Sequence, residues 1–426
     1  MAARIMAGLW VVIAMLFAGA QAAPSPAYQA RAAQLVRVLT APGEETDFFS
    51  TLFLEAVPVD RWRTIAADLR AQHGKPLALG AVSRTSDTAG QVEVRYERAT
   101  VGFTLVVAPQ APSRVVGLHI VGAKVSQDSM DKVMADIATL PGRTAFAVAL
   151  LEDGAPRLLY ARDADPQMAT GSSFKLYLLA EMVRATAAGE RRWSDVAPLG
   201  PKSFSGRLMQ WPDGAPITLH SLATAMIAES DNSAADTLMQ VLGREKVDAM
   251  LAATGHAAAG KTLPVLTTAE AFALKMPGNA DLRRRYEAAS PEGRRALLSE
   301  AAARLTAANV DVGSVAEVPT AIESIEWFAS PRDMIGLLDW LRRRGGEALP
   351  ILAVSPGIAP ADAKRWRYLG YKGGSEPGVM AMNFLAQGQD GRWYAMSGMW
   401  NNPAARVEEA QFVALMTRAL NLLADR

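Results

Sequence analysis

The 426-residue sequence contains no cysteine. This absence excludes disulfide bonds, a thiolate nucleophile and any metal site built on cysteine ligands. Histidine is scarce as well, and no two histidines stand at the short spacing that zinc sites use. We therefore expect no metal and no other cofactor. All four histidines are interpreted as structural or surface residues: His73, His119, His220 and His256.

The sequence also lacks an excess of positive or negative charge. Lysine and arginine together number 44, and aspartate and glutamate 43. Such a chain has no global field that would attract nucleic acid or an acidic membrane surface, so nucleic acid is not an expected partner. The arginine-rich stretch 279–308 could form a local nucleic-acid patch. Its alternating acidic residues instead favour a solvated helical insertion at about residues 276–310.

One long apolar run stands at the N-terminus, over residues 5–20. It follows Arg4 and precedes Ala20-Gln21-Ala22, which matches a small-x-small cleavage site. This layout predicts a signal peptide over residues 1–22 and a periplasmic or secreted protein without stable membrane insertion after cleavage. The alternative is an uncleaved anchor, because the run approaches the length that spans a bilayer.

The pattern of apolar residues predicts two domains and an α+β fold class. In residues 26–135, helical spacing comes first, and two-residue alternation follows at Val92, Val94 and Tyr96. Helices followed by an antiparallel sheet make a small α+β domain. The helices expected there cover about 27–40, 48–53 and 60–69, and the strands include 92–96, 103–107 and 115–120. A polar helical segment, 127–140, leads to a boundary at Pro141-Gly142.

The second domain is expected over residues 141–426. A strand over 144–152 and its hairpin partner over 157–162 open it, and a strand over 393–400 and a helix over 407–424 close it. Helical patterns dominate between these two ends. The sequence therefore predicts an antiparallel sheet flanked by helices, built from both ends of the domain, with an all-helical block between them.

The first chemical motif is Ser172-Ser173-Phe174-Lys175, an S-x-x-K at the expected start of a helix. Positions three apart share one face of a helix, so the Ser172 hydroxyl and the Lys175 amine are expected to be neighbours. A neutral lysine can take the proton of a serine and make it a nucleophile. The motif alone is weak, because Ser129 to Lys132 is a second copy in a polar helical stretch.

Two further motifs follow in the same domain. Ser230-Asp231-Asn232 places a hydroxyl and an amide on one loop, although the same residue types also serve as helix N-caps. The segment 372–375, Lys-Gly-Gly-Ser, stands on an expected strand. Its glycines would let a substrate lie against the backbone, and Lys372 would supply a cation. A simple glycine turn is the alternative.

In the order S-x-x-K, S-D-N, K-[TSG]-G, these motifs resemble the signature of the serine β-lactamases and penicillin-binding proteins. The second domain resembles a class A β-lactamase. The whole mature chain is similar to the two-domain β-lactamase-like serine hydrolases found beside clavulanic-acid biosynthesis, which join a small steroid-isomerase-like, or cystatin-like, domain to a lactamase-like one. The segments 325–331 (IEWFASP) and 373–378 (GGSEPG) match that group.

The resemblance implies roles for individual residues. Ser172 would attack the substrate carbonyl, and Lys175 would take its proton. Ser230 would pass a proton towards the leaving group, with Lys372 close to it.

The resemblance also implies the contacts of the substrate. Asn232 would touch the substrate amide, and Gly374 would lie along the substrate. The hydroxyl of Ser375 would meet a substrate carboxylate. The backbone N–H groups of Ser172 and Ser375 would form the oxyanion hole.

One departure from the family matters. Class A enzymes carry a glutamate, on a loop after S-D-N, that directs water at the acyl-enzyme. The matching stretch here, 261–268, contains no acid, and the sequence assigns that role to none of Glu270, Glu323 and Glu326. Acylation is expected to survive, whereas deacylation is expected to be slow.

The sequence therefore predicts an exported serine hydrolase that forms an acyl-enzyme with a β-lactam, an ester or a related small acyl compound. The alternatives are a peptidase of the D-Ala-D-Ala type and a binding protein that is acylated without turnover. The first domain is expected to serve in packing or docking rather than in holding a small apolar ligand. The sequence leaves the oligomeric state open.

Overall fold

The computed structural model describes residues 25–426, except for the side chains of residues 314–316. The signal peptide expected over 1–22 lies outside the described residues. The chain divides into two compact units, one ending at Asp128 and one spanning Ser129–Arg426. None of the described helices is both long and apolar enough to cross a membrane.

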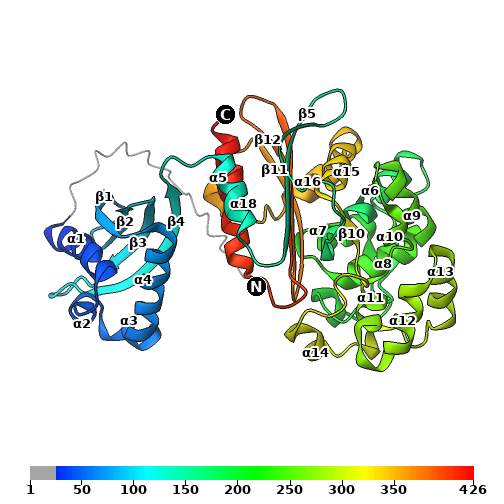
Figure 1. Cartoon of the computed structure of the whole chain (residues 1–426), viewed down its shortest axis with the longest axis horizontal. Coiled ribbons are helices and arrows are strands. Elements are labelled where there is room, and N and C mark those ends of the chain that lie inside the picture. Colours follow the sequence, from blue (N-terminus) through cyan, green and yellow to red (C-terminus); the bar gives the residue numbers. More distant parts are fainter. Residues whose placement is uncertain (1–24) are drawn as a thin grey trace, which may run out of the picture. The chain divides into compact units, whose positions relative to one another are not determined.

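The first unit holds a four-stranded antiparallel sheet with the strands in chain order, and helices precede it (Figure 1). Its helices are α1 (Pro26–Thr40), α2 (Glu45–Phe48), α3 (Thr51–Ala56) and α4 (Val59–His73), and its strands are β1 (Pro76–Arg84), β2 (Ala89–Tyr96), β3 (Ala99–Val107) and β4 (Val115–Val125). Strand β1 was not predicted. Its burial does not alternate and its pairing with β2 is interrupted by register shifts, so its sequence lacks the two-residue pattern that marks β2.

Aromatic side chains fill the interior of this first unit. The ring of Phe49 stacks on Phe53 with centroids 4.2 Å apart and meets Trp62 edge-on at 4.9 Å. The buried side of β2, with Val92, Val94 and Tyr96, belongs to the same core. The resemblance of this unit to steroid-isomerase-like domains remains a prediction.

The second unit contains a five-stranded antiparallel sheet in the order β11-β12-β13-β5-β6. Its strands are β5 (Arg143–Leu151), β6 (Arg157–Arg162), β11 (Tyr368–Glu376), β12 (Val379–Gln387) and β13 (Trp393–Asn401). The expected α+β class is confirmed, and the sheet is indeed built from both ends of the unit. Strand β12, which is buried almost without interruption, was not predicted.

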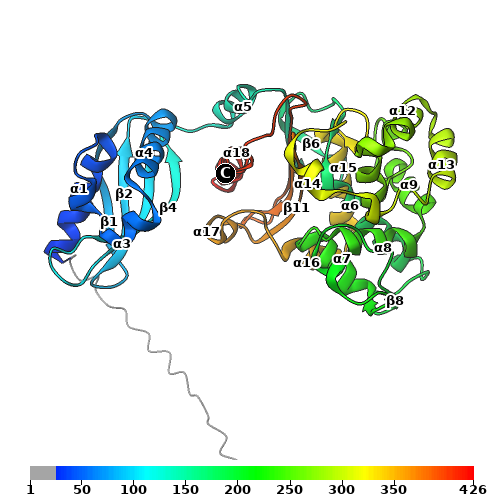
Figure 2. The same ribbon diagram turned by 90° about the horizontal axis from the view of Figure 1, so that it is seen from below.

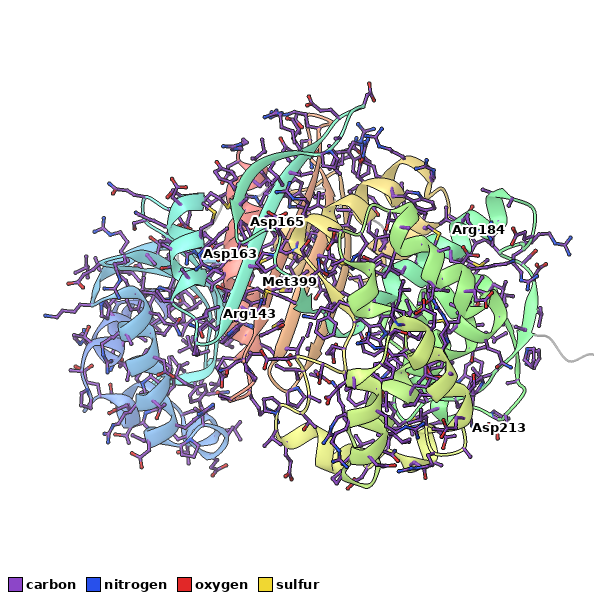
Figure 3. The ribbon with its side chains drawn as sticks, turned by 45° about the vertical axis from the view of Figure 1, so that its right-hand side comes forward. Arg143, Asp163, Asp165, Arg184, Asp213 and Met399 are labelled. Carbon is purple, nitrogen blue, oxygen red and sulfur yellow. The ribbon has the colours of Figure 1, made fainter. Side chains whose placement is uncertain are left out.

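Both faces of the sheet are covered. Helices α5 (Met130–Ala138) and α18 (Glu409–Ala424) lie against one face, and the helical block lies against the other (Figures 1 and 2). Along β5, small residues (Ala145, Ala147) enter the core on the side of the helical block, whereas Phe146 enters the core shared with α18. Met399 of β13, labelled in Figure 3, also belongs to the core on the helical side.

Helix α5 belongs with the second unit, whereas the sequence analysis placed this helical segment before the domain boundary. Val133 and Ile137 are fully buried in the core that contains Phe146 of β5 and Phe412 of α18. This burial explains why the boundary between the two compact units falls before α5 in the chain rather than after it.

The helical block includes residues 276–310, where an insertion is predicted, and two short two-stranded sheets. The helices are α6 (Lys175–Ala187), α7 (Leu219–Ala228), α8 (Asn232–Leu242), α9 (Arg244–Ala253), α10 (Ala259–Thr262), α11 (Thr268–Lys275), α12 (Ala280–Ala288), α13 (Pro291–Glu300), α14 (Val312–Glu317), α15 (Pro331–Arg344), α16 (Ala348–Ala353) and α17 (Pro360–Ala363). The 3₁₀ helices are η1 (Gly171–Phe174), η2 (Arg207–Gln210), η3 (Pro277–Asn279) and η4 (Ala307–Asn309), and the short strand pairs are β7 (Met168–Ala169) with β10 (Phe328–Ala329) and β8 (Val196–Pro198) with β9 (Pro216–Thr218).

Arginines of the insertion pair with its own acids. Arg304 bonds Asp281 at 2.7 Å, and Arg285 bonds Glu300 at 2.7 Å. These exposed pairs fit the solvated helical segment that the alternating charges predicted.

Candidate active site

Ser172 stands in η1, the 3₁₀ turn that leads into α6. Side chains three residues apart eclipse one another in a 3₁₀ helix, so Ser172 and Lys175 lie on the same side of the turn. Ser172 is partly exposed, whereas α6 is buried over most of its length and fixes the turn in place. Gly171 has φ of +50°, a backbone conformation that glycine adopts without a steric penalty.

The amine of Lys175 is fully buried and makes two short hydrogen bonds. Nζ lies 2.6 Å from the backbone oxygen of Ser230 and 2.6 Å from Oδ1 of Asn232. Burial lowers the pKa of Lys175 to about 7, although the charges of Asp236 and Asp231 oppose the shift. A neutral amine has two hydrogens and one lone pair. Those two acceptors can take both hydrogens, which leaves the lone pair for a proton.

Ser230 links the two lysines of the motifs. Its Oγ lies 3.3 Å from Nζ of Lys175 and 3.0 Å from Nζ of Lys372. Its φ of +56° is uncommon for a residue other than glycine, and the surrounding contacts hold it there. Asp231, the next residue, caps α8 by accepting the N–H of Ala234, and it also accepts the N–H of Leu208.

The N-cap expected in the S-D-N segment is present, and the catalytic role of the segment remains a prediction. The cap is Asp231, one residue before Asn232 where α8 begins. Asn232 uses both ends of its amide, because Oδ1 accepts from Lys175 and Nδ2 donates to Ser205 Oγ at 2.7 Å. Ser205 was not predicted as a site residue, since it lies in an irregular loop far from the three motifs in sequence.

Lys372 is buried on β11, and its Nζ donates to the backbone oxygen of Gly373. Burial, and then the charge of Lys175, lower the pKa of Lys372 well below its usual value. Both lysines contact Ser230, and a charge on Lys175 disfavours a charge on Lys372. Lys372 was expected to be a simple cation, whereas its surroundings disfavour a permanent charge.

Strand β11 passes directly beside the turn that carries the nucleophile. A Cβ atom added to Gly374 would lie 2.5 Å from the backbone nitrogen of Ser172 and 2.7 Å from that of Ser173. A Cβ atom added to Gly171 would lie 3.1 Å from the nitrogen of Ser375. The backbone segments of Ser172 and Ser375 are thus in contact, and the Ser375 side chain is exposed.

A buried amide network supports both segments from behind. Asn383 of β12 donates to Ser173 Oγ at 2.9 Å and to the backbone oxygen of Lys372 at 3.1 Å. Ser397 of β13 in turn donates to Asn383 Oδ1 at 2.8 Å. These residues come from strands that the motifs do not reach, so sequence reasoning had no signal for them.

The three acids that remained without a role lie in different surroundings. Glu270 forms the capping box of α11 and pairs with Arg244 at 2.6 Å. Glu323 is exposed and lines a small hollow. Glu326 is buried, and its Oε2 accepts the backbone N–H of Gly171 at 3.2 Å.

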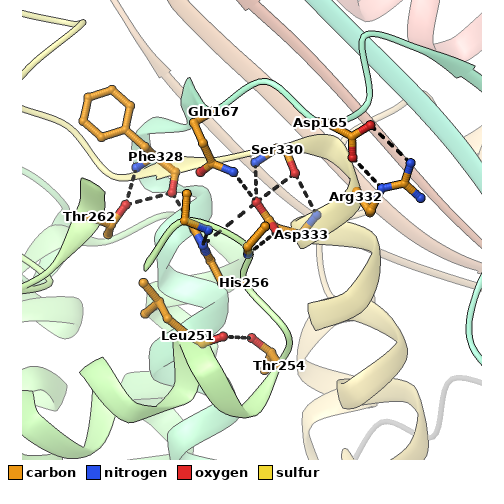
Figure 4. Close-up of polar contacts among 12 residues, drawn as sticks. Asp165, Gln167, Leu251, Thr254, His256, Thr262, Phe328, Ser330, Arg332 and Asp333 are labelled. Atoms are coloured by element: carbon orange, nitrogen blue, oxygen red, sulfur yellow. Dashed lines mark hydrogen bonds and ion pairs between the residues drawn. The ribbon is translucent and has the colours of Figure 1, made fainter. Parts of the chain in front are cut away.

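The residues just after Glu326 are anchored by a polar network (Figure 4). Thr262 Oγ1 donates to the backbone oxygen of Phe328 and accepts its N–H, each at 2.8 Å. His256 Nε2 also lies 2.8 Å from that oxygen, so this histidine has the structural role expected for it. Ser330 and Asp333 form a capping box at the start of α15.

The second S-x-x-K copy has a different role. Ser129 caps α5 by accepting the N–H of Lys132 at 3.2 Å. This copy therefore serves as a helix start. By contrast, hydrogen bonds join Lys175, Ser230, Asn232 and Lys372, and backbone contacts bring the Ser172 segment against Gly374 and Ser375.

Three solved structures resemble this chain at low sequence identity. The chain is similar to a β-lactamase from Chitinophaga pinensis DSM 2588, at 17% identity over 69% of this chain and 97% of that chain, with a TM-score of 0.48. A β-lactamase from Sphaerobacter thermophilus DSM 20745 has 18% identity over 70% and 96%, with a TM-score of 0.47. A structure described as PBP-A has 14% identity over 69% and 94%, also with a TM-score of 0.47.

No curated protein matches the chain. The model of the β-lactamase enzyme family matches residues 128–346, just over half of the sequence, and this match includes Ser172, Lys175 and the 230–232 segment. Membership of this family supports serine acyl transfer or hydrolysis in broad terms. The chain therefore belongs to the β-lactamase enzyme family.

Proposed function

We propose that this protein is an exported serine hydrolase that forms an acyl-enzyme at Ser172 with a β-lactam, an ester or a related small acyl compound. The observation that carries the proposal is the environment of Lys175. Its buried amine, with a pKa lowered to about 7, lies three residues after Ser172 on the same side of the turn. Export is proposed from the apolar N-terminal run and from the family, whose members are typically exported.

In the proposed acylation, the Ser172 Oγ bonds to the substrate carbonyl carbon while its proton passes to Lys175. The N–H groups of Ser172 and Ser375 donate to the oxygen that becomes negative, which is worth roughly 3 kcal/mol for each donor. Ser230 then gives a proton to the leaving nitrogen or oxygen, and the proton is replaced through the lysines that contact it. A substrate carbonyl near Asn232 would replace Ser205 as the acceptor of Nδ2.

Hydrolysis of the acyl-enzyme needs a water that a base activates. The amines of Lys175 and Lys372 donate to oxygen atoms of serine, asparagine and glycine residues. Among the described residues, no carboxylate accepts a hydrogen bond from either amine. We therefore propose that acylation is faster than deacylation, so that the acyl-enzyme accumulates.

The test is the mass of the intact protein during incubation with a penicillin, a cephalosporin and a simple thioester. The expected result is a mass gain in the wild type that decays slowly, and no gain in Ser172→Ala. Ser129→Ala is the matched control, because it changes the serine of the second S-x-x-K copy, and it should be acylated like the wild type. The proposal would be contradicted if none of the three probes formed an adduct with the wild type, or if Ser172→Ala formed one.

The rate of acylation should depend on pH with a midpoint near 7. The pKa of Lys175 is lowered from 10.5 to about 7, so its amine is neutral and able to accept a proton only above that pH. Below pH 6 the rate should fall by about tenfold for each pH unit, because the basic form becomes scarce. The measurement is the adduct formation rate from pH 5 to 9. A rate that is flat over this range would show that Lys175 is not the base.

A further inference from the structure

Two carboxylates share one lysine beside the nucleophile, and the proposed chemistry uses none of the three residues. Lys275, at the end of α11, places Nζ 2.7 Å from Glu326 Oε1 and 2.5 Å from Glu376 Oε1. The side chains are 1%, 0% and 7% exposed, respectively. Lys275, Glu326 and Glu376 are called the Lys275 cluster below.

The cluster touches both backbone segments of the proposed oxyanion hole. Glu326 accepts the N–H of Gly171, the residue before Ser172. Glu376 is the last residue of β11 and directly follows Ser375. The bonds from Lys275 to the two glutamates therefore tie the segment of one N–H donor to the segment of the other.

The charges of the cluster balance only if one of the two glutamates is protonated. With every group ionised, one lysine and two glutamates would carry a net negative charge, and burying such a charge is costly. Burial, and then the charge of Glu326, raise the pKa of Glu376 well above its usual value. Burial alone would lower the pKa of Lys275, but the charges of Glu326 and Glu376 outweigh this effect and raise that pKa above its usual value. A protonated Glu376 leaves the cluster neutral, so that it adds no negative charge where an oxyanion would form.

The backbone around Glu326 is held on both sides. The ring of Trp327 stacks on Phe174 of η1 with centroids 4.0 Å apart, and its Nε1 donates to the backbone oxygen of Leu266 at 2.9 Å. The backbone oxygen of Trp327 also accepts the N–H of Thr170 at 3.0 Å. These contacts of Trp327 therefore fix the backbone that carries Glu326, and so hold its carboxylate beside Gly171.

We infer that the Lys275 cluster is a positioning device for acyl transfer: it sets the spacing between the backbone N–H groups of Ser172 and Ser375. This inference rests on the proposed function, because the two N–H groups matter only if an oxyanion forms between them. The three residues act through the backbone and do not contact the reacting atoms.

The test compares Glu326→Ala with Glu326→Gln. The alanine variant removes the acceptor of the Gly171 N–H. The glutamine variant can turn its single oxygen to that N–H, with its NH2 group then beside Lys275. Loss of one oxyanion donor costs about 10²–10³-fold, so a displaced donor should lower the limiting acylation rate by about 10–100-fold. The half-saturating substrate concentration should change little, and Glu326→Gln should recover most of the rate. Glu270→Gln is the control, since it changes a glutamate on α11 outside the cluster.

Amide hydrogen exchange in peptides that cover residues 169–174 and 374–378 gives a readout that needs no activity. Exchange there should be faster in Glu326→Ala and close to wild type in Glu326→Gln. If the alanine variant does not fold, Glu376→Ala, at the most exposed member of the cluster, carries the same two measurements. Wild-type rates and wild-type exchange in a folded alanine variant would overturn the inference. If the wild type forms no adduct, the proposed function fails, while the exchange data still decide whether the cluster holds these segments.

Discussion

Replacing Lys175 with methionine is expected to slow the acylation of Ser172 by about 10²–10⁴-fold, the usual contribution of a general base. Methionine fills a similar volume but has no lone pair that can take the serine proton. The same variant should have a higher melting temperature than the wild type. A buried lysine with a lowered pKa loses, on folding, the hydration and the proton that it holds in the unfolded chain.

The measurements are the rate of adduct formation by mass and the melting temperature by calorimetry. Lys132→Met is the matched control, since it changes the lysine of the second S-x-x-K copy and should leave acylation unchanged. Rapid acylation of Lys175→Met would mean that another group takes the proton. A large fall in melting temperature would mean that Lys175 stabilises the fold rather than serving the reaction at a cost to stability.

Replacing Gly374 with alanine is expected to reduce acylation by about 10²–10³-fold, as for the loss of one oxyanion donor. The added Cβ would collide with the backbone oxygen of Thr170 and lie 2.5 Å from the nitrogen of Ser172. Both are backbone atoms, so they cannot rotate away as the end of a side chain could. The turn that carries Ser172 and the strand that carries Ser375 would have to separate.

Gly260→Ala is the control for this variant, because a Cβ at Gly260 meets no atom within 4 Å. Acylation is measured on protein whose circular dichroism matches the wild type. A folded Gly374→Ala that is acylated at the normal rate would contradict the close approach of β11 to the nucleophile.

The clustering of the proposed site residues could be predicted from sequence, because they stand in three short motifs whose order along the chain is distinctive. Lys175, Ser230, Asn232 and Lys372 lie within hydrogen-bond distance of one another as a group. The motif copy at Ser129 shows the limit of such patterns, since the same spacing there makes only a helix cap. What separated the two copies was their context: a strand pair before Ser172 and an apolar helix after it.

The supporting residues could not be predicted in the same way. Asn383 and Ser205 reach the site from a strand and a loop that carry no motif, and only the folded chain brings them there. The Lys275 cluster joins residues that are 50 to 101 positions apart. Lysine and glutamate usually mark exposed faces, so burial of all three has no signature in the sequence.

Some strands were predicted from a period of two residues, and others from an apolar run beside a turn signal, as for β5. Strand β2 has one buried face and alternates, whereas β12 is covered on both faces and reads as a continuous apolar run. Strand β1 alternates poorly because its pairing with β2 shifts register. Strand β12 was missed although the equally buried β5 was predicted beside its hairpin signal, whereas β1 was missed because its pairing is irregular.

The most direct test of the central claim is to locate the acyl group. Wild-type protein is quenched after a short incubation with a penicillin, digested with trypsin and analysed by fragmentation mass spectrometry. The added mass is expected on the peptide of residues 163–175, and within it on Ser172 rather than Ser173 or Thr170. An adduct on any other residue, or none in wild-type protein that is folded, would contradict the assignment of Ser172 as the nucleophile.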